Sequence, residues 1–139
     1  MAEPRIAYID LETSPSLGYF FDLWAENNIL DTEQDWFILS FGVSWNGGPT
    51  KVYALPDYSG YSKDRTNDKK LVADLWKVFD EADVIVAHNA AGFDIKKSNS
   101  RFLVHGMRPP SPFQVIDTLK IARKHFKMDS NRLDDLARY

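Results

Sequence analysis

The sequence predicts a single α/β domain built on a mixed five-stranded sheet with flanking helices. The turn signal "NGGP" at residues 46–49 joins two strand-like segments, as in an antiparallel hairpin. The unbroken apolar run "VIVA" at residues 84–87 lies between two helical patterns and is typical of a parallel strand buried on both faces. A chain of 139 residues with 44% hydrophobic residues can bury one core.

The expected elements follow the order βββαβαβα, with right-handed crossovers between the parallel strands. Asn67 or Asp68 is the expected N-cap of the first helix, and Gly106 ends the second helix. Strands are expected at residues 5–10, 35–45, 51–54, 84–87 and 113–117, and helices at residues 69–81, 94–105, 118–126 and from 130 onward.

Composition narrows the classes of function. The chain has no cysteine, which excludes disulfides, thiolate nucleophiles and cysteine zinc sites. The N-terminus has no signal-peptide pattern, and the longest apolar run is shorter than a membrane span. We therefore expect a soluble cytoplasmic protein without a membrane partner.

Charge is unevenly distributed along the chain. Residues 1–60 hold 2 Lys+Arg and 9 Asp+Glu, whereas residues 96–139 hold 10 Lys+Arg and 4 Asp+Glu. Solvated helix faces explain a basic C-terminal part without any function. The alternative is a basic surface beside an acidic cluster, as a phosphodiester substrate and bound metal ions together require.

Two acids, Asp10 and Glu12, stand where the first expected strand stops. Residues two apart on a strand point to the same face, so both carboxylates project together while Leu11 points to the opposite layer. Neighbouring carboxylates repel each other unless a cation lies between them, and Mg²⁺ and Mn²⁺ prefer such oxygens. The alternative is an ordinary solvated strand end.

The second acidic element is "HNAAGFD", residues 88–94, directly after the buried strand. Ligands of α/β sheets bind outside the carboxyl ends of parallel strands, which favours a site here. Alternatively, Asp94 is only a helix N-cap and Asn89 only forms an Asx turn. Together with Asp10 and Glu12, Asp94 predicts a metal site open to a phosphate.

Three segments, "YIDLET", "HNAAGFD" and "IDTLKIARKHF...NRLDDLARY", resemble the DEDD 3′–5′ exonucleases of the ribonuclease H-like superfamily. The likeness spans nearly the whole chain and is greatest to phage and bacterial relatives of polymerase-associated exonuclease domains. It implies a ribonuclease H-like fold for residues 1–139, with Asp10, Glu12 and Asp94 as catalytic metal ligands. By this resemblance, the segment around Glu12 and Thr13 meets the 3′-terminal nucleotide. We expect Thr13, Asn89 and Phe93 to bind the substrate.

The same resemblance implies an activity. We expect metal-dependent 3′–5′ hydrolysis of DNA, with RNA as another possible substrate, releasing nucleoside monophosphates. The family uses a two-metal site of Mg²⁺ or Mn²⁺. The expected partners are single-stranded DNA or the 3′ ends of nucleic acid, together with a DNA polymerase or replication protein. For a phage-encoded protein, the compartment would be the bacterial host cytoplasm.

One departure from the family concerns the fourth ligand. The family's third motif is a Tyr or His followed four residues later by an Asp, and Asp134 and Asp135 do not match it. Asp117 is better interpreted as a cap of the next helix. We therefore expect a truncated or naturally short domain that lacks its C-terminal helix and holds one metal ion. The rival hypotheses are a catalytically impaired nucleic-acid-binding or protein-interaction domain, and a single-metal phosphodiesterase acting on small nucleotides.

Other residues have both a functional and a structural interpretation. Phe20, Phe21 and Trp24 could stack on bases or pack within the protein. His88 could contact a phosphate or a metal, or be a hydrogen-bonded structural residue. Five cations could guide the nucleic-acid backbone or simply cover solvated helix faces: Lys96, Lys97, Arg101, Arg123 and Lys124.

Overall fold

The computed structural model describes residues 2–21 and 29–139 and confirms the mixed five-stranded sheet. The strand order is β5-β4-β1-β6-β7, so the first long strand lies at the centre. The strands of this sheet are β1 (Ile6–Thr13), β4 (Ile38–Trp45), β5 (Thr50–Ala54), β6 (Val84–Ala87) and β7 (Gln114–Asp117). The α-helices are α1 (Lys69–Glu81), α2 (Asp94–Val104), α3 (Thr118–His125) and α4 (Leu133–Leu136), and a 3-10 turn covers Leu55–Asp57.

Pairing in the sheet follows the predicted meander and crossovers. β1 is antiparallel to β4, β4 is antiparallel to β5, and β1, β6 and β7 run parallel to one another. The β4–β5 hairpin turns through Asn46 and Gly47, whose φ angles are 50° and 75°. Both residues have left-handed backbones and form the turn that is closed by the hydrogen bond from the Gly48 amide to the Trp45 carbonyl, which explains the "NG" signal.

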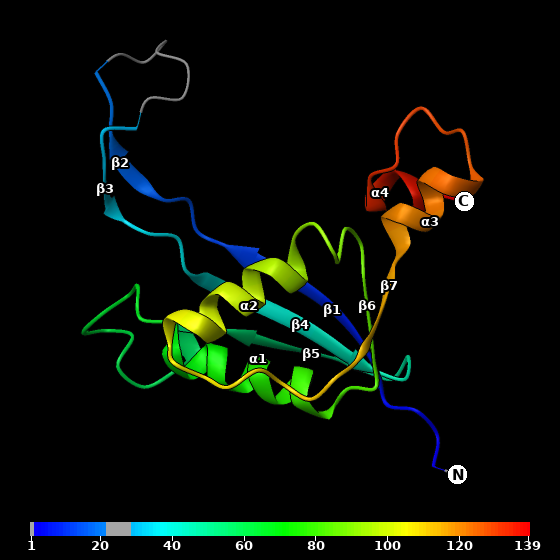
Figure 1. The fold of residues 1–139 in the computed structure, drawn as a ribbon, viewed down its shortest axis with the longest axis horizontal. Helices are drawn as coiled ribbons and strands as arrows, with labels where there is room; N and C mark the ends of the chain where they lie inside the picture. The colour runs from blue at the N-terminus through cyan, green and yellow to red at the C-terminus, as the bar shows by residue number, and fades with distance from the viewer. Residues whose placement is uncertain (1, 22–28) are drawn as a thin grey trace.

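The two faces of the sheet differ in their surroundings. On β1, Ala7, Ile9 and Leu11 are buried, whereas Asp10 and Glu12 are exposed on the opposite face. The buried face packs against α1 and α2, which lie side by side across it (Figure 1). Alternation along the central strand therefore places the two acids on the face opposite the helical layer.

The expectation that "VIVA" is buried on both faces was wrong for one face. Ile85 and Ala87 are buried, but Val84 and Val86 are only half-buried. The face that carries Val86 borders an open groove instead of a second helical layer. The parallel pairing of β6 was nevertheless predicted correctly.

Two strand boundaries also differ from the prediction. β1 continues to Thr13, because its pairing with β4 runs past both acids and ends in an irregularity between Glu12 and Thr13. β4 begins at Ile38 instead of Asp35, and the preceding residue Phe37 bonds to Ser14 through its amide and its carbonyl. Cross-strand pairing thus overrides the low strand propensity of the acids.

A two-stranded ribbon was not predicted. β2 (Leu17–Tyr19) and β3 (Asp31–Gln34) pair antiparallel and extend away from the main sheet (Figure 1). Phe20 and Phe21 follow β2 and are 52% and 88% exposed, so they are not packed in a core. Trp24 lies outside the described residues.

Helices α1, α2 and α3 agree closely with the sequence pattern, whereas α4 was expected from residue 130 onward and covers only Leu133–Leu136. α1 covers the predicted residues 69–81, and α2 ends at Val104 with Gly106 in the left-handed region, as expected for a C-terminal glycine. Asp68 is the N-cap residue of α1, but its side chain does not cap the helix and turns into the protein. Within the described residues, no helix combines the length and apolar character that crossing a membrane requires.

Candidate active site

Asp10 and Glu12 line a groove on the open face of the sheet. The groove has a volume of about 490 Å³ and crosses β1, β4, β5 and β6. Its floor beside the acids is made of small residues, because Gly42 pairs with Asp10 and Ser40 pairs with Glu12. The small side chains leave the space above both carboxylates open to a ligand.

Asp94 approaches the same place from the other side of β1. It is the first residue of α2 and is only 3% exposed. The backbone amide of Leu11, the residue between Asp10 and Glu12, lies near the Asp94 carboxyl group and lowers its pKa. The fold therefore brings the three predicted acids to one end of the central strand: Asp10 and Glu12 line the groove, and Asp94 is buried near the strand but does not line the groove.

Electrostatics couple Asp94 to its acidic neighbours. Burial raises the pKa of Asp94 to about 7, and the negative charges of Asp10 and Asp117 act in the same direction. The backbone amides of Asp94 itself and of Leu11 lower this pKa but do not offset the burial. Burial and neighbouring negative charges raise the free energy of the ionised carboxylate, and a nearby cation would lower it.

The loop between β6 and α2 is held by Asp117. Its carboxylate accepts hydrogen bonds from the backbone amides of Asn89 and Ala91, at 3.0 and 3.1 Å. The same carboxylate caps α3 by accepting from the amides of Leu119 and Lys120, which confirms the predicted cap. Burial opposes ionisation, but these four donors outweigh it and hold the pKa of Asp117 below its ordinary value.

Sequence reasoning missed the first of these two roles of Asp117. The register of the parallel strands places Asp117 opposite Ala87, the last residue of β6. The contact between Asp117 and the loop after β6 could have been predicted once β6 and β7 were known to be neighbours. The signal is an Asp at the end of one strand beside a second strand that ends in a loop. The carboxylate thus fixes the loop that leads to Asp94.

Asn89 and Phe93 shape that loop. Asn89 has a left-handed backbone with φ of 69°, and its carbonyl accepts from the amides of Gly92 and Phe93. The Asn89 side chain lies so close over Gly92 that a Cβ atom there would collide with the side-chain oxygen of Asn89. Phe93 is half-buried against the core, and Thr13 is half-buried at the end of β1. Both remain predictions as substrate contacts.

His88 is a structural residue in this conformation. Its Nε2 donates to the carbonyl of Asn131 at 2.8 Å, and its Nδ1 lies 2.9 Å from the hydroxyl of Thr118. With both ring nitrogens engaged by the protein, the imidazole joins β6 to α3 and to the segment before α4. This arrangement supports the structural interpretation of His88 over the metal-ligand one.

The residues present fit a divalent cation in chemistry and charge. Carboxylate oxygens are the ligands that Mg²⁺ and Mn²⁺ prefer, and a cation would stabilise the ionised form of Asp94 beside Asp10. Across the described ranges 2–21 and 29–139, no three His, Asp or Glu side chains are gathered in an arrangement that could hold a metal ion. Asp10 and Glu12 are exposed, so packing does not fix their side chains in one orientation.

The predicted basic residues divide into exposed and buried sets. Lys96, Arg123 and Lys124 are exposed, as a role in guiding a nucleic-acid backbone requires. Arg101 is only 7% exposed and pairs with Asp68, so both interpretations of it, a contact with the nucleic-acid backbone and a solvated helix face, were wrong. Lys97 is half-buried, with its ammonium 3.7 Å from the centre of the Trp36 ring.

The strand order, the helical layer and the acids on the central strand define a ribonuclease H-like α/β domain. A model of the RNase_H superfamily matches residues 19–139, which is most of the chain but does not include Asp10 or Glu12. The protein belongs to the RNase_H superfamily. No match was found among curated proteins.

Solved structures share this fold. The chain resembles the family B DNA polymerase from the hyperthermophilic archaeon Pyrobaculum calidifontis with a TM-score of 0.61 and 20% sequence identity. The similarity covers 99% of this chain but only 18% of the polymerase chain. At this identity the likeness establishes the fold.

Proposed function

We propose that this chain is a metal-dependent 3′–5′ exonuclease that hydrolyses the phosphodiester bonds of DNA, with RNA as a second possible substrate, and releases nucleoside monophosphates. The observation that carries the proposal is the approach of buried Asp94, with its raised pKa, to Asp10 on the central strand. Perturbed carboxylates beside an open groove are typical of functional sites. Membership of the RNase_H superfamily and the resemblance of the acidic segments to DEDD exonucleases support the same reaction.

In this proposal each residue has a defined role. Asp10, Glu12 and Asp94 would hold Mg²⁺ or Mn²⁺, which when bound supplies an activated water and stabilises the leaving oxygen. Thr13, Asn89 and Phe93 would orient the terminal nucleotide beside the groove. Asp117 would keep the Asn89 loop in place through its two amide contacts. The expected substrate is a single-stranded 3′ end, and a DNA polymerase or replication protein is the partner that the proposal suggests.

A rival of a different class is a nucleic-acid-binding or protein-interaction domain without catalysis. It is favoured by one observation: in the described part of the chain, the carboxylates are not gathered into a three-ligand metal cluster. Asp10 and Glu12 would then contribute only surface charge.

The test incubates the protein with single-stranded DNA labelled at the 3′ end, in Mn²⁺ and in EDTA, beside an Asp10→Ala variant. The exonuclease proposal predicts that the wild type releases labelled mononucleotide rapidly in Mn²⁺ but not in EDTA, and that the variant does not release it in either. DNA labelled at the 5′ end should shorten progressively. Binding without metal-dependent release would support the rival. Hydrolysis of dinucleotides but not of longer DNA would instead indicate a small-nucleotide phosphodiesterase.

A further inference from the structure

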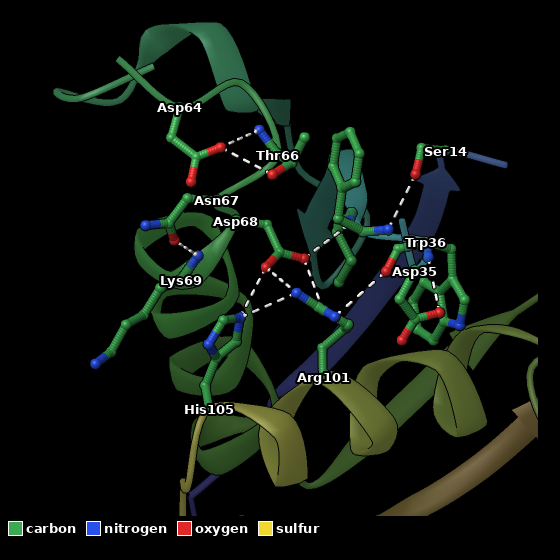
Figure 2. Close-up of polar contacts among 12 residues, drawn as sticks. Ser14, Asp35, Trp36, Asp64, Thr66, Asn67, Asp68, Lys69, Arg101 and His105 are labelled. Atoms are coloured by element: carbon green, nitrogen blue, oxygen red, sulfur yellow. Dashed lines mark hydrogen bonds and ion pairs between the residues drawn. The ribbon is translucent and has the colours of Figure 1, made fainter. Parts of the chain in front are cut away.

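Asp68 forms a buried cluster with Arg101 and His105, here called the Asp68 cluster (Figure 2). The Asp68 side chain is fully buried, the Arg101 side chain is 9% exposed and the His105 side chain is 13% exposed. Arg101 Nε donates to Asp68 Oδ2 at 2.9 Å, Arg101 Nη2 donates to Oδ1, and His105 Nε2 lies 2.7 Å from Oδ1. Nothing in the proposed reaction uses these groups directly.

The helix that carries Asp94 buries more polar side chains than apolar ones. Its buried residues are Asp94, Ser98, Arg101 and Phe102, so only one of the four is apolar. Asp94, Ser98 and Arg101 follow a spacing of four and three residues, which places them on one face of the helix. Apolar packing is non-directional, whereas a bidentate ion pair fixes an orientation. Phe102 packs against Phe79 and, within the described residues, Ser98 Oγ has no hydrogen-bond partner, so Arg101 supplies the directional contacts of this helix.

The same carboxylate reaches the strand pair that carries Glu12. Asp68 Oδ2 also accepts from the backbone amide of Ile38 at 2.8 Å. Ile38 begins β4 and pairs with Thr13, the residue after Glu12. Arg101 also donates to the carbonyl of Trp36 at 3.3 Å, just before β4 (Figure 2). One buried carboxylate thus connects the helix of Asp94 to β4, which pairs with the strand that carries Asp10 and Glu12.

We infer that Asp68 and Arg101 are positioning residues for the acidic site: they fix α2 against β1 and β4 and so set where Asp94 lies relative to Asp10 and Glu12. This inference rests on the proposed metal-dependent function. A buried ion pair is weak evidence for stability, because well-packed apolar residues can replace such pairs with little loss. A role in positioning α2 explains the ion pair better than a role in stability, because small displacements of catalytic groups strongly reduce the rate of a reaction.

The test compares Mn²⁺ dissociation constants of the wild type and Arg101→Lys, measured by the electron paramagnetic resonance signal of free Mn²⁺. Lysine keeps the positive charge but cannot form the bidentate pair. We expect the dissociation constant to rise at least about tenfold, as for other residues that support metal ligands indirectly. Arg108→Lys is the matched control, because Arg108 pairs with Asp80 on the exposed surface, and it should leave the constant unchanged.

A second control shows whether a loss of stability alone weakens Mn²⁺ binding. Val78→Ala removes buried methyl groups from α1 outside the Asp68 cluster, so it lowers stability while keeping Mn²⁺ affinity within about twofold of the wild type. If Arg101→Lys does not fold, Arg101→Gln replaces it, because glutamine can donate one hydrogen bond to Asp68 but cannot form the bidentate pair. The Mn²⁺ dissociation constant of this variant should also rise at least about tenfold.

The outcomes separate the two proposals. Wild-type affinity in folded Arg101→Lys, or in Arg101→Gln where Arg101→Lys does not fold, overturns the positioning role. A wild type that binds Mn²⁺ no better than its Asp10→Ala variant instead overturns the proposed metal-dependent function.

Discussion

Replacing Asp94 by asparagine should make the metal-free protein more stable at high pH. Asparagine has nearly the size of a protonated aspartic acid but carries no charge that burial could oppose. The carboxylate has a pKa of about 7 in the folded protein, against an ordinary value of 3.8. Each pKa unit corresponds to about 1.4 kcal/mol, so the ionised group destabilises the fold by up to about 4 kcal/mol.

The sign follows from proton linkage. The folded protein binds this proton more tightly than the unfolded chain does, so its contribution to stability is fully present below about pH 4 and is lost as pH rises through about 7. The free energy of unfolding of Asp94→Asn should equal that of the wild type near pH 4 and exceed it by about 2–4 kcal/mol at pH 8. A divalent cation should raise the stability of the wild type at pH 8 and have little effect on the variant.

Urea denaturation at several pH values between 4 and 8 in EDTA measures this difference directly. Glu3→Gln, which removes an exposed acid before β1, is the control and should give a difference close to zero throughout. A difference between Asp94→Asn and the wild type that stays constant from pH 4 to 8 would refute the argument from burial and neighbouring charge.

Three further changes test other parts of the structure. The two carboxylate oxygens of Asp117 accept hydrogen bonds from four backbone amides, and Asp117→Asn leaves only one acceptor oxygen. The free energy of unfolding in urea should therefore fall by about 1–3 kcal/mol. An unchanged urea midpoint would contradict the role of Asp117 in holding the loop. Gly92→Ala should displace the Asn89 side chain, seen as a shifted Asn89 side-chain amide resonance, and an unshifted resonance would count against the close contact. Gly47→Ala forces alanine into the left-handed region, so the protein should lose about 1 kcal/mol of stability in thermal unfolding, and a gain would rule out the turn geometry.

The sequence predicted those elements whose pattern is local. Helix α1 has a broad apolar face and matched its expected residues, and the "NG" turn located the β4–β5 hairpin. The β2–β3 ribbon was missed because its strands are short and its side chains are mostly exposed, so no burial pattern marks it.

Contacts between distant segments could not be predicted in the same way. Asn67 or Asp68 was the expected N-cap of α1, but the Asp68 carboxylate does not cap the helix and instead contacts Arg101, thirty-three residues away. Arg101 was assigned to the surface because an isolated charge is usually exposed. In the candidate site, period-two alternation correctly placed Asp10 and Glu12 on one face, whereas the raised pKa of Asp94 depends on burial that only the packed fold reveals.

The central claim, that Asp10, Glu12 and Asp94 together bind a divalent cation, is tested most directly by Mn²⁺ titration at pH 8 of the wild type beside Asp10→Asn, Glu12→Gln and Asp94→Asn. The account predicts saturable binding by the wild type and a dissociation constant at least about tenfold higher in each variant, because each removes a charged ligand. Equal Mn²⁺ affinity in the wild type and all three variants would contradict it.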